Sequence, residues 1–497
     1  MRVLVLEHPR LASREHFNDI ANTPLWSCLM AGYAAAAMAR AGAQVSLLDA
    51  RGWSFRQAEE RVLAAEPDLL AVHAVYFWEH TGRLFDFLAR LKRRGLAGPI
   101  CLFGFFPSLA WHRMLESWDW LDLVVVGEPE QTLARLVAPG GLTDPGAIAG
   151  LAGPRCRRLR PRPPLAHLDR LAPPWRPNLE EEETVSVLAS RGCYNRCSFC
   201  LVPALAGRGW RGRSVDSVAA EVADLVERGK RDFYFVDPNF IGPGRRGRAR
   251  ARELARALAG LKIGFGMETR AGDLDQDLVE ELAAAGLQGL LLGLESAHPA
   301  ALERMGKNTP PPVNLAAIRA VRAAGLEPEV GFLMFDPQGA LEEVEANFAF
   351  LQEAGLLDRL SRTANLLSHQ QIALLGTPLY ARAAAQGRLS PRGVLGFEGV
   401  ISFRDRRVAW LAGPVRALCL EVLARGGRPE SPLYWRREQP GAEPFARVNR
   451  FLVSSFREFL QLAREPEPSP AWTAGLLEDY RRELDRLLEG ERAIPGS

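Results

Sequence analysis

The feature that most constrains the fold of this chain is a regular alternation of short apolar runs with helical stretches. It begins with the strand-like run VLVLE (3–7), an alanine-rich helical stretch (29–42) and a second strand-like run, VSLLD (45–49). Further apolar runs follow at 69–77, 100–104 and 122–127. Continuous apolar strands that alternate with helices are typical of a parallel sheet covered on both faces. We therefore predict an α/β fold that opens with a doubly wound, Rossmann-like parallel sheet.

The same alternation resumes at residue 184 and continues to about residue 389. Strand-like runs that each precede a helical stretch lie at 185–190, 232–237, 263–269, 287–295 and 329–335, and a last strand candidate lies within 365–375. About six strand–helix units predict a partial or full parallel barrel of the (β/α)6 kind. In such a barrel the active site lies at the carboxyl ends of the strands.

Two segments interrupt this alternation. Residues 150–183 are rich in proline and charge without a sustained period, which predicts an interdomain linker. From about residue 390 the pattern changes again, with amphipathic helical stretches at 445–463 and 474–490. A chain of 497 residues is long enough for two or three domains. We expect four parts, namely a sheet domain (1–149), the linker (150–183), the barrel (184–389) and a mainly helical region (390–497).

Charge and composition argue against several classes of protein. The formal net charge is only +3, with 24% charged and 47% hydrophobic residues, which is the balance of a soluble globular protein. This charge indicates neither a nucleic-acid partner nor a membrane surface, and no run approaches the roughly 18 apolar residues of a membrane span. The opening MRVLVLEHPR becomes charged too early for a signal peptide. We therefore expect a cytoplasmic protein, in which clustered cysteines bind metals or catalyse more often than they form disulfides.

The segment RGCYNRCSFC (191–200) places Cys193, Cys197 and Cys200 directly after the first strand of the expected barrel. This C-x3-C-x2-C spacing supplies three ligands, whereas a closed zinc site needs four. The nearest other cysteine, Cys156, lies in the proline-rich linker. A site with three thiolates leaves one metal position open, as catalytic sites do. The spacing favours an iron–sulfur cluster, and a zinc site or a chance cluster of thiols stays open as an alternative.

In this position the cysteine motif resembles the signature of radical S-adenosylmethionine (SAM) enzymes. In that family three cysteines hold a 4Fe–4S cluster, and SAM binds the fourth iron. The resemblance covers residues 184–340 and implies that Cys193, Cys197 and Cys200 are the cluster ligands. It also implies that Phe199, between the last two cysteines, packs beside the adenine of SAM.

Polar residues at the following strand ends extend the resemblance. FVDPNF offers Asp237, where the family places a partner for the amino group of SAM. METR offers Glu268 and Arg270 for the ribose and carboxylate of SAM, and GLES offers Glu295 and Ser296 after the next strand. Two of these residues have ordinary structural alternatives. Asp237 precedes a proline and could cap a turn, and Glu295 could serve as an ion-pair partner.

The N-terminal region resembles the cobalamin-binding domain that precedes the barrel in cobalamin-dependent radical SAM enzymes. The resemblance rests on TPLWSCLMAGYAAAAMARAG (23–42), GFFPS (104–108), DLVVVGEPEQT (122–132) and HLDRLAPP (167–174). The implied cobalamin contacts, on loops after two strands, are Gly104, Phe105, Ser108, Gly127, Glu128 and Thr132. A nucleotide-binding or vestigial domain is the alternative, since a doubly wound fold does not fix function. None of the eight histidines lies in a D-x-H-x-x-G motif, so we expect base-off cobalamin without a histidine on cobalt.

The resemblance implies a cobalamin-dependent radical SAM methyltransferase. Such an enzyme methylates an unactivated carbon of a small metabolite by way of a 5′-deoxyadenosyl radical and methylcobalamin. The nearest alternative uses the same cofactors for a cyclisation, oxidation or rearrangement without methyl transfer. The implied partners are a small-molecule substrate and a one-electron donor such as flavodoxin or ferredoxin, and we expect a monomer.

Two further classes fit the sequence less well. A transfer-RNA methylthiotransferase needs three more cysteines in the N-terminal region, which holds only Cys28 and Cys101. The C-terminal region also lacks a basic RNA-binding module. A zinc-stabilised binding protein is the non-enzymatic alternative.

Overall fold

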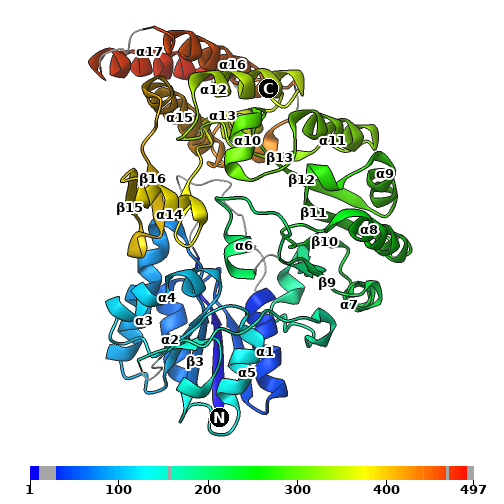
Figure 1. The fold of residues 1–497 in the computed structure, drawn as a ribbon, viewed down its shortest axis with the longest axis vertical. Coiled ribbons are helices and arrows are strands. Elements are labelled where there is room, and N and C mark those ends of the chain that lie inside the picture. Colours follow the sequence, from blue (N-terminus) through cyan, green and yellow to red (C-terminus); the bar gives the residue numbers. More distant parts are fainter. Residues whose placement is uncertain (11–28, 155–157, 207–208, 440, 466–469, 490–497) are drawn as a thin grey trace, which may run out of the picture.

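The computed structural model describes residues 1–10, 29–154, 158–206, 209–439, 441–465 and 470–489, so that Cys28 and Cys156 lie outside the described residues. An N-terminal sheet domain, an open barrel and a group of C-terminal helices follow one another along the longest axis of the molecule (Figure 1). Within the described ranges, none of the helices has the length and apolar character needed to cross a membrane.

The N-terminal sheet has six strands in the order β2-β1-β3-β4-β5-β6. All neighbours are parallel except β5 and β6, which are antiparallel. The strands are β1 (Arg2–Glu7), β2 (Gln44–Asp49), β3 (Leu69–His73), β4 (Ile100–Phe103), β5 (Leu123–Val125) and β6 (Leu151–Ala152). The helices are α1 (Leu29–Arg40), α2 (Phe55–Ala65), α3 (Thr81–Arg93), α4 (Phe105–Ser117) and α5 (Pro129–Val137), with 3-10 turns η1 (Trp78–His80) and η2 (Pro145–Ala147).

Both faces of this sheet are buried, which explains its continuously apolar strands. Alternate side chains of a strand point to opposite faces. In β1, Leu4 and Leu6 pack with α2, α3 and α4, whereas Val3 and Val5 pack with α1 and α5. The predicted doubly wound sheet is confirmed.

The second sheet is the wall of an open barrel. Its five strands are parallel and stand in chain order, β7 (Thr184–Val187), β10 (Asp232–Phe235), β11 (Gly264–Arg270), β12 (Leu287–Glu295) and β13 (Glu329–Phe332). The helices after these strands are α7 (Val215–Glu227), α8 (Gly244–Ala259), α9 (Gln276–Ala284), α10 (Pro299–Met305), α11 (Pro311–Ala323) and α12 (Leu341–Glu353). Helices α7, α8, α9 and α11 form a row outside the strands (Figure 1). Shorter elements are η3 (Leu168–Arg170), η4 (Leu179–Glu181), the antiparallel pair β8 (Ser190–Arg191) and β9 (Arg211–Gly212), α6 (Leu201–Ala206) and η5 (Ala271–Asp273).

The sixth barrel strand, predicted within 365–375, is reduced to a single bridge. Most of its first half is helix α13 (Leu360–Ser368), in which Leu360, Ala364 and Leu367 are buried at helical spacing. Only a parallel bridge between Phe335 and Gln370 continues the sheet. The barrel therefore has five strands and one bridge, which agrees with the predicted partial barrel.

A small antiparallel sheet follows the barrel and was not predicted. Its strands are β14 (Ala373–Leu374), β16 (Glu398–Ile401) and β15 (Leu389–Arg392), in that order, with α14 (Pro378–Ala385) and η6 (Val394–Gly396) between them. The β15 sequence LSPR is mostly exposed and shows no apolar alternation, so it gives no strand signal. The boundary expected between residues 389 and 390 falls inside this strand.

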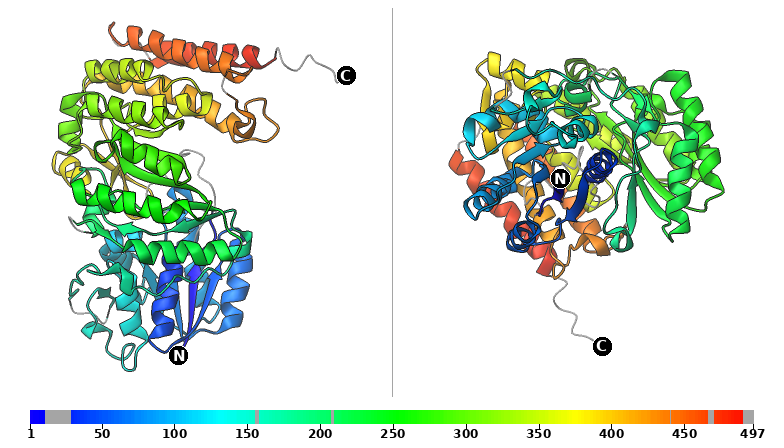
Figure 2. Two further views of the ribbon diagram at one scale, coloured as in Figure 1. Left: turned by 90° about the vertical axis from the view of Figure 1, so that its right-hand side faces the viewer. Right: turned by 90° about the horizontal axis from the view of Figure 1, so that it is seen from below.

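The C-terminal region is helical, as predicted. It consists of α15 (Arg406–Gly426), η7 (Trp435–Arg437), α16 (Phe445–Leu462) and α17 (Pro470–Glu489). These helices share the barrel's hydrophobic core; the rings of Phe348 in α12 and Phe456 in α16 lie 4.5 Å apart. They form the end of the molecule opposite the N-terminal sheet (Figure 2).

The two parallel sheets meet through residues that follow their carboxyl ends. The strands of the N-terminal sheet run from the chain terminus towards the barrel (Figure 1). Beyond β5, Glu130 of α5 accepts a hydrogen bond of 2.5 Å from Arg191, which follows β7. Glu128 forms a second ion pair across the same boundary, 2.7 Å from Arg211. This arrangement brings together the two edges at which parallel sheets bind ligands.

Candidate active site

The three cysteines lie on the loop between β8 and α6, where Cys193, Cys197 and Cys200 are partly buried, unpaired thiols. The backbone of Ser198 anchors this loop on both sides. Its N–H donates to the carbonyl of Met305 (2.8 Å), and its carbonyl accepts from the N–H of Leu379 (2.8 Å). The cysteine loop is therefore held in place by α10 and by the start of α14.

Gly306 allows α10 to end directly against the cysteine loop. Its φ is 69°, and a Cβ at this position would lie 2.8 Å from the carbonyl oxygen of Arg196. Only glycine adopts this conformation so close to another backbone without strain. Nearby, the Asn195 amide donates to Cys197 Sγ (3.1 Å) and to the carbonyl of Lys307 (3.1 Å).

The electrostatics of the loop suit a cluster better than free thiolates. Burial raises the pKa of the Cys197 thiol and raises that of Cys200 to about 12, although the Lys307 ammonium opposes the effect at Cys197. Thiolates here need the positive charge of a bound metal. No three His, Cys, Asp or Glu side chains in the described ranges are arranged to hold a single metal ion. In a 4Fe–4S cluster each thiolate binds a different iron, so three thiolates on one loop fit such a cluster.

Phe199 is half-buried between the barrel and the small antiparallel sheet. It packs against two hydrophobic clusters, one that contains Met305 and Leu333 and one that contains Tyr380 and Ile401. This position fixes the aromatic ring beside the cysteines. Contact with the adenine of SAM stays a prediction.

Asp237 follows β10 and is fully buried. Its Oδ2 accepts from the N–H of Ala189 on the neighbouring chain segment (3.1 Å), and its Oδ1 has no hydrogen-bond partner in the described structure. Burial raises the pKa of Asp237 to about 6, although hydrogen bonds from Ser190 and Ala189 to this carboxylate oppose the effect. A buried carboxylate oxygen without a donor is costly, and a cationic ligand group would satisfy it.

Glu268 and Arg270 lie in the last part of β11. Glu268 is half-buried, accepts from the Tyr234 hydroxyl (3.0 Å), and has its pKa raised by burial. Arg270 is buried and donates to the carbonyl of Lys307 (2.9 Å) and the hydroxyl of Thr309 (3.1 Å). Its Nε has no partner in the described structure. Both side chains thus retain hydrogen-bonding capacity for a ligand at the strand ends.

A polar network beside Arg270 was missed by sequence reasoning. Tyr194 donates to Asp273 and accepts from Arg270, whose guanidinium lies 4.9 Å from the centre of the tyrosine ring. Asn239 also donates to Asp273 (2.9 Å) and accepts from the Thr269 hydroxyl (2.8 Å). In the sequence, only the position of Tyr194 next to Cys193 indicated that this tyrosine could belong to the site. The network links the cysteine loop to the ends of β10 and β11.

The side chains of Glu295 and Ser296 interact mainly with other groups of the protein. Glu295 pairs with Lys307 at 2.8 Å, so the ion-pair alternative considered for this residue is realised. Ser296 is fully buried, donates to Asn347 Oδ1 (2.9 Å) and accepts from the N–H of His298 (3.1 Å). The Ser296 hydroxyl donor therefore ties the end of β12 to α12. Contact of either residue with SAM stays a prediction.

The two N-terminal segments expected to be loops are mostly helical. Phe105–Ser108 form the first turn of α4, and α5 starts at Pro129, which is favoured at a first helical position because it lacks an N–H. Ser108 joins the two segments. Its hydroxyl donates to the carbonyl of Gly104 (2.6 Å) and accepts from the N–H of Gly127 (3.0 Å).

Glu128 and Thr132 are also engaged by protein groups. Glu128 accepts from the N–H of Leu165 (2.6 Å) in addition to its ion pair with Arg211. Thr132 is fully buried, donates to the carbonyl of Ala149 (3.1 Å) and accepts from Arg162 (2.8 Å). These contacts hold the start of α5 against the linker and the barrel.

At this edge of the sheet the side-chain position of Gly127 is open, and Phe105 is partly exposed. Gly127 has φ 97°, and a Cβ there would meet nothing within 4 Å. Phe105 is half-buried and joins none of the hydrophobic clusters of the described residues. Gly104 differs, because a Cβ there would lie 2.9 Å from Cδ2 of His73. Its missing side chain makes room for that ring.

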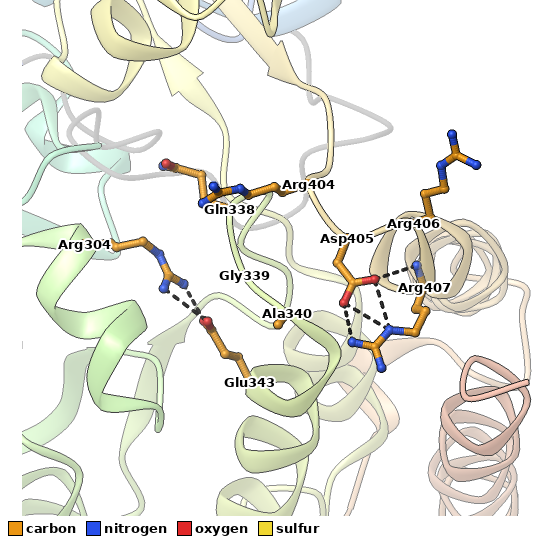
Figure 3. Close-up of a pocket in the computed structure, with 9 residues that line it drawn as sticks. All are labelled: Arg304, Gln338, Gly339, Ala340, Glu343, Arg404, Asp405, Arg406 and Arg407. Carbon is orange, nitrogen blue, oxygen red and sulfur yellow. Dashed lines mark hydrogen bonds and ion pairs between the residues drawn. The ribbon is translucent and has the colours of Figure 1, made fainter.

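A pocket of about 540 Å³ lies between α10, the start of α12 and the start of α15 (Figure 3). It is lined by Arg304, Gln338, Gly339, Ala340, Glu343, Arg404, Asp405, Arg406 and Arg407. Arg304 faces Glu343 across it, and Asp405 pairs with Arg407 (Figure 3). None of the predicted site residues lines this pocket.

Comparison with known proteins places the cysteine loop and barrel in a family. The model of the radical SAM superfamily matches residues 187–351. An uncharacterised methyltransferase of Pyrococcus horikoshii is 25% identical over 343 residues, which cover 64% of this chain and 72% of the relative. The anaerobic magnesium-protoporphyrin IX monomethyl ester cyclase of Synechocystis is 29% identical over 346 residues, covering 65% of this chain and 66% of the cyclase.

Two solved structures share the fold. The cobalamin-dependent SAM radical enzyme OxsB, with aqua-cobalamin bound, superposes with a TM-score of 0.70 at 18% identity, covering 97% of this chain and 75% of OxsB. The radical SAM methyltransferase TsrM from Kitasatospora setae gives a TM-score of 0.60 at 18% identity, covering 78% of this chain and 75% of TsrM. The arrangement of sheet domain and barrel is thus shared with these enzymes. The chain is thus an enzyme that carries a radical SAM domain at residues 187–351.

Proposed function

We propose that this protein is a cobalamin-dependent radical SAM methyltransferase that methylates an unactivated carbon of a small metabolite. One observation carries the proposal. The cysteine loop after β7 and the open space at Gly127 after β5 lie at the facing carboxyl ends of two parallel sheets, which the Arg191–Glu130 ion pair joins. The fold shared with OxsB and TsrM, whose structures hold cobalamin, supports the same reading.

In this proposal the barrel residues hold the cluster and SAM. Cys193, Cys197 and Cys200 bind a 4Fe–4S cluster. The unpartnered atoms of Asp237 and Arg270 suit the amino and carboxylate groups of SAM. Glu268 and Phe199 suit its ribose and adenine, and Glu295 and Ser296 act mainly by supporting this strand end.

The N-terminal residues hold cobalamin in two ways. Gly127 offers space and Phe105 offers an apolar surface. The other residues stabilise the conformation of this edge through their contacts with the protein, namely Gly104, Ser108, Glu128 and Thr132. The bound groups supply a 5′-deoxyadenosyl radical and a transferable methyl group. The protein orients them and excludes water. The proposal includes a small-molecule substrate, an external one-electron donor, a monomeric state and a cytoplasmic location.

A second candidate is a cyclisation with the same cofactors but without methyl transfer. The similarity to magnesium-protoporphyrin ester cyclases, 29% identity over 65% of this chain for the Synechocystis enzyme, favours it. The two candidates differ in whether the methyl group of SAM ever leaves sulfur for cobalt.

This difference can be tested before the substrate is known. The reconstituted protein, loaded with hydroxocobalamin, is reduced and incubated with SAM that carries a deuterated methyl group. Mass spectrometry of the extracted cobalamin should then show labelled methylcobalamin. Cobalamin that is retained but stays unlabelled, together with formation of 5′-deoxyadenosine, would contradict methyl transfer and support the second candidate.

A further inference from the structure

A buried ion pair lies between the cysteine loop and the end of β12. Lys307 is only 4% exposed, and its Nζ lies 2.8 Å from Glu295 Oε1. Glu295 is the only carboxylate with which it pairs in the described part of the chain. A buried pair gains little stability over apolar residues of similar size. Its presence here therefore points to a role other than stability.

The backbone of β12 is shaped around this pair. Glu295 has a φ of 70°, at the point where the register between β12 and β13 shifts. A Cβ at Gly293 would lie 2.7 Å from the Lys307 amine and 2.9 Å from the Glu295 carboxylate. A non-glycine residue in the left-handed region is strained, and such strain concentrates at functional sites. The left-handed backbone at Glu295 and the missing side chain of Gly293 together allow the Lys307 amine and the Glu295 carboxylate to be in contact.

Lys307 also connects the cysteine loop to Arg270. Its carbonyl accepts hydrogen bonds from Asn195 (3.1 Å) and Arg270 (2.9 Å). The same Asn195 amide donates to Cys197 Sγ at 3.1 Å. The backbone position of Lys307 is therefore tied to a cysteine of the motif through Asn195.

We propose that Lys307, held by Glu295, is a positioning residue whose buried positive charge makes the iron–sulfur cluster easier to reduce. Reduction adds one electron, and hence one negative charge, to the cluster. A nearby cation stabilises that charge strongly where water is excluded. The electron comes from an external one-electron donor, and dithionite supplies it in the redox titration that tests the proposal. The inference rests on the proposed cluster at the three cysteines and is independent of cobalamin and methyl transfer.

The test is a redox titration of the reconstituted protein, in which electron paramagnetic resonance follows the reduced cluster. Lys307→Met should lower the midpoint potential by about 59 mV. For a one-electron couple this shift lowers the ratio of reduced to oxidised cluster about tenfold at a fixed potential. Glu295→Gln should raise the midpoint potential, because it removes the opposing negative charge. The double variant should lie between the two single variants.

Lys262→Met is the matched control, since Lys262 is exposed and precedes the amino end of β11. Its midpoint potential should equal that of the wild type. If Lys307→Met prevents cluster assembly, Glu295→Gln and the double variant decide the question. An intact cluster whose midpoint potential is the same in all variants would overturn this inference alone. The same holds if Lys307→Met weakens SAM binding without moving the potential. A wild-type protein that binds no cluster would overturn the proposed function as well.

Discussion

At the scale of single residues, Asp237 combines full burial with a carboxylate oxygen that has no partner in the described structure. Burial raises its pKa from the ordinary 3.8 to about 6, so the ligand-free fold loses stability as pH rises from about 4 to about 6. Asp237→Asn should therefore stabilise the ligand-free protein by about 3 kcal/mol at pH 8 and by about 1 kcal/mol at pH 4.5. Urea unfolding at the two pH values measures both differences.

Asp232→Asn is the control for this prediction, because Asp232 is an exposed residue at the start of the same strand. It should leave the free energy of unfolding nearly unchanged. A destabilised Asp237→Asn protein at pH 8 would show that the carboxylate is satisfied inside the protein. The same substitution should weaken SAM binding, so that stability and function change in opposite directions.

Glu268 provides a second test at this scale. Glu268→Ala should weaken SAM binding about 10- to 100-fold, because a hydrogen bond to a charged group contributes roughly 1.5–3 kcal/mol. The cluster should stay intact, since the Glu268 carboxylate accepts its hydrogen bond in the described structure from Tyr234 and not from the cysteine loop. Anaerobic calorimetric titration with SAM measures the affinity, and the iron content checks the cluster. Unchanged affinity would place Glu268 outside the SAM site.

At the scale of elements, the small antiparallel sheet docks on the N-terminal domain through an aromatic cluster. The Phe397 ring, next to β16, is fully buried and lies 4.5 Å from Tyr76 and 4.7 Å from Phe106. Phe397→Ala should cost about 3–5 kcal/mol of stability and should increase proteolysis within 373–401. Val400→Ala, at a half-buried position on β16, should cost much less. Equal costs for both variants would show that the aromatic cluster does not hold the sheet in place.

Sequence patterns predicted the helices and strands whose own residues show a clear hydrophobic pattern. The run of β12 was placed to the residue, at 287–295, because it is long and rich in leucine. The strand β15 could not be predicted, since its pairing with β16 rather than its own sequence makes it a strand. The spacing of the three cysteines favoured a cluster, and their role as its ligands stays a prediction. The contacts of Tyr194 and Lys307 depend on tertiary packing, so no local pattern could assign them a role.

At the scale of the whole molecule, the account requires cobalamin at the carboxyl edge of the N-terminal sheet. Gly127→Trp should abolish cobalamin retention, because it fills the open space beside this residue and strains a backbone with φ 97°. Iron content should be unchanged, because the cysteine loop lies in the barrel. Gly140→Trp, at another glycine of positive φ in the same domain, is the control and should retain cobalamin. Loss of cobalamin from both variants would indicate general damage to the domain.

The state of bound cobalt tests the same region. His8 uses both ring nitrogens within the protein, with Pro9 and Val75 as partners. His73 pairs with Glu7 through Nδ1 (2.9 Å) and stacks on Phe103, and it does not lie in a D-x-H-x-x-G motif. We expect no nitrogen splitting from histidine in the Co(II) electron paramagnetic resonance spectrum. Splitting that disappears in His73→Ala would contradict this expectation and identify His73 as the ligand.

The most direct test of the central claim is to measure iron and cobalt together in the wild type and in the variant with Cys193, Cys197 and Cys200 all replaced by alanine. Both proteins are reconstituted anaerobically with iron, sulfide and hydroxocobalamin. The wild type should hold about four irons and about one cobalt per chain, since the two cofactors occupy separate domains. The variant should lose its iron, keep its cobalt and no longer cleave SAM. A variant that still holds about four irons, or a wild type that retains no cobalt, would contradict the account.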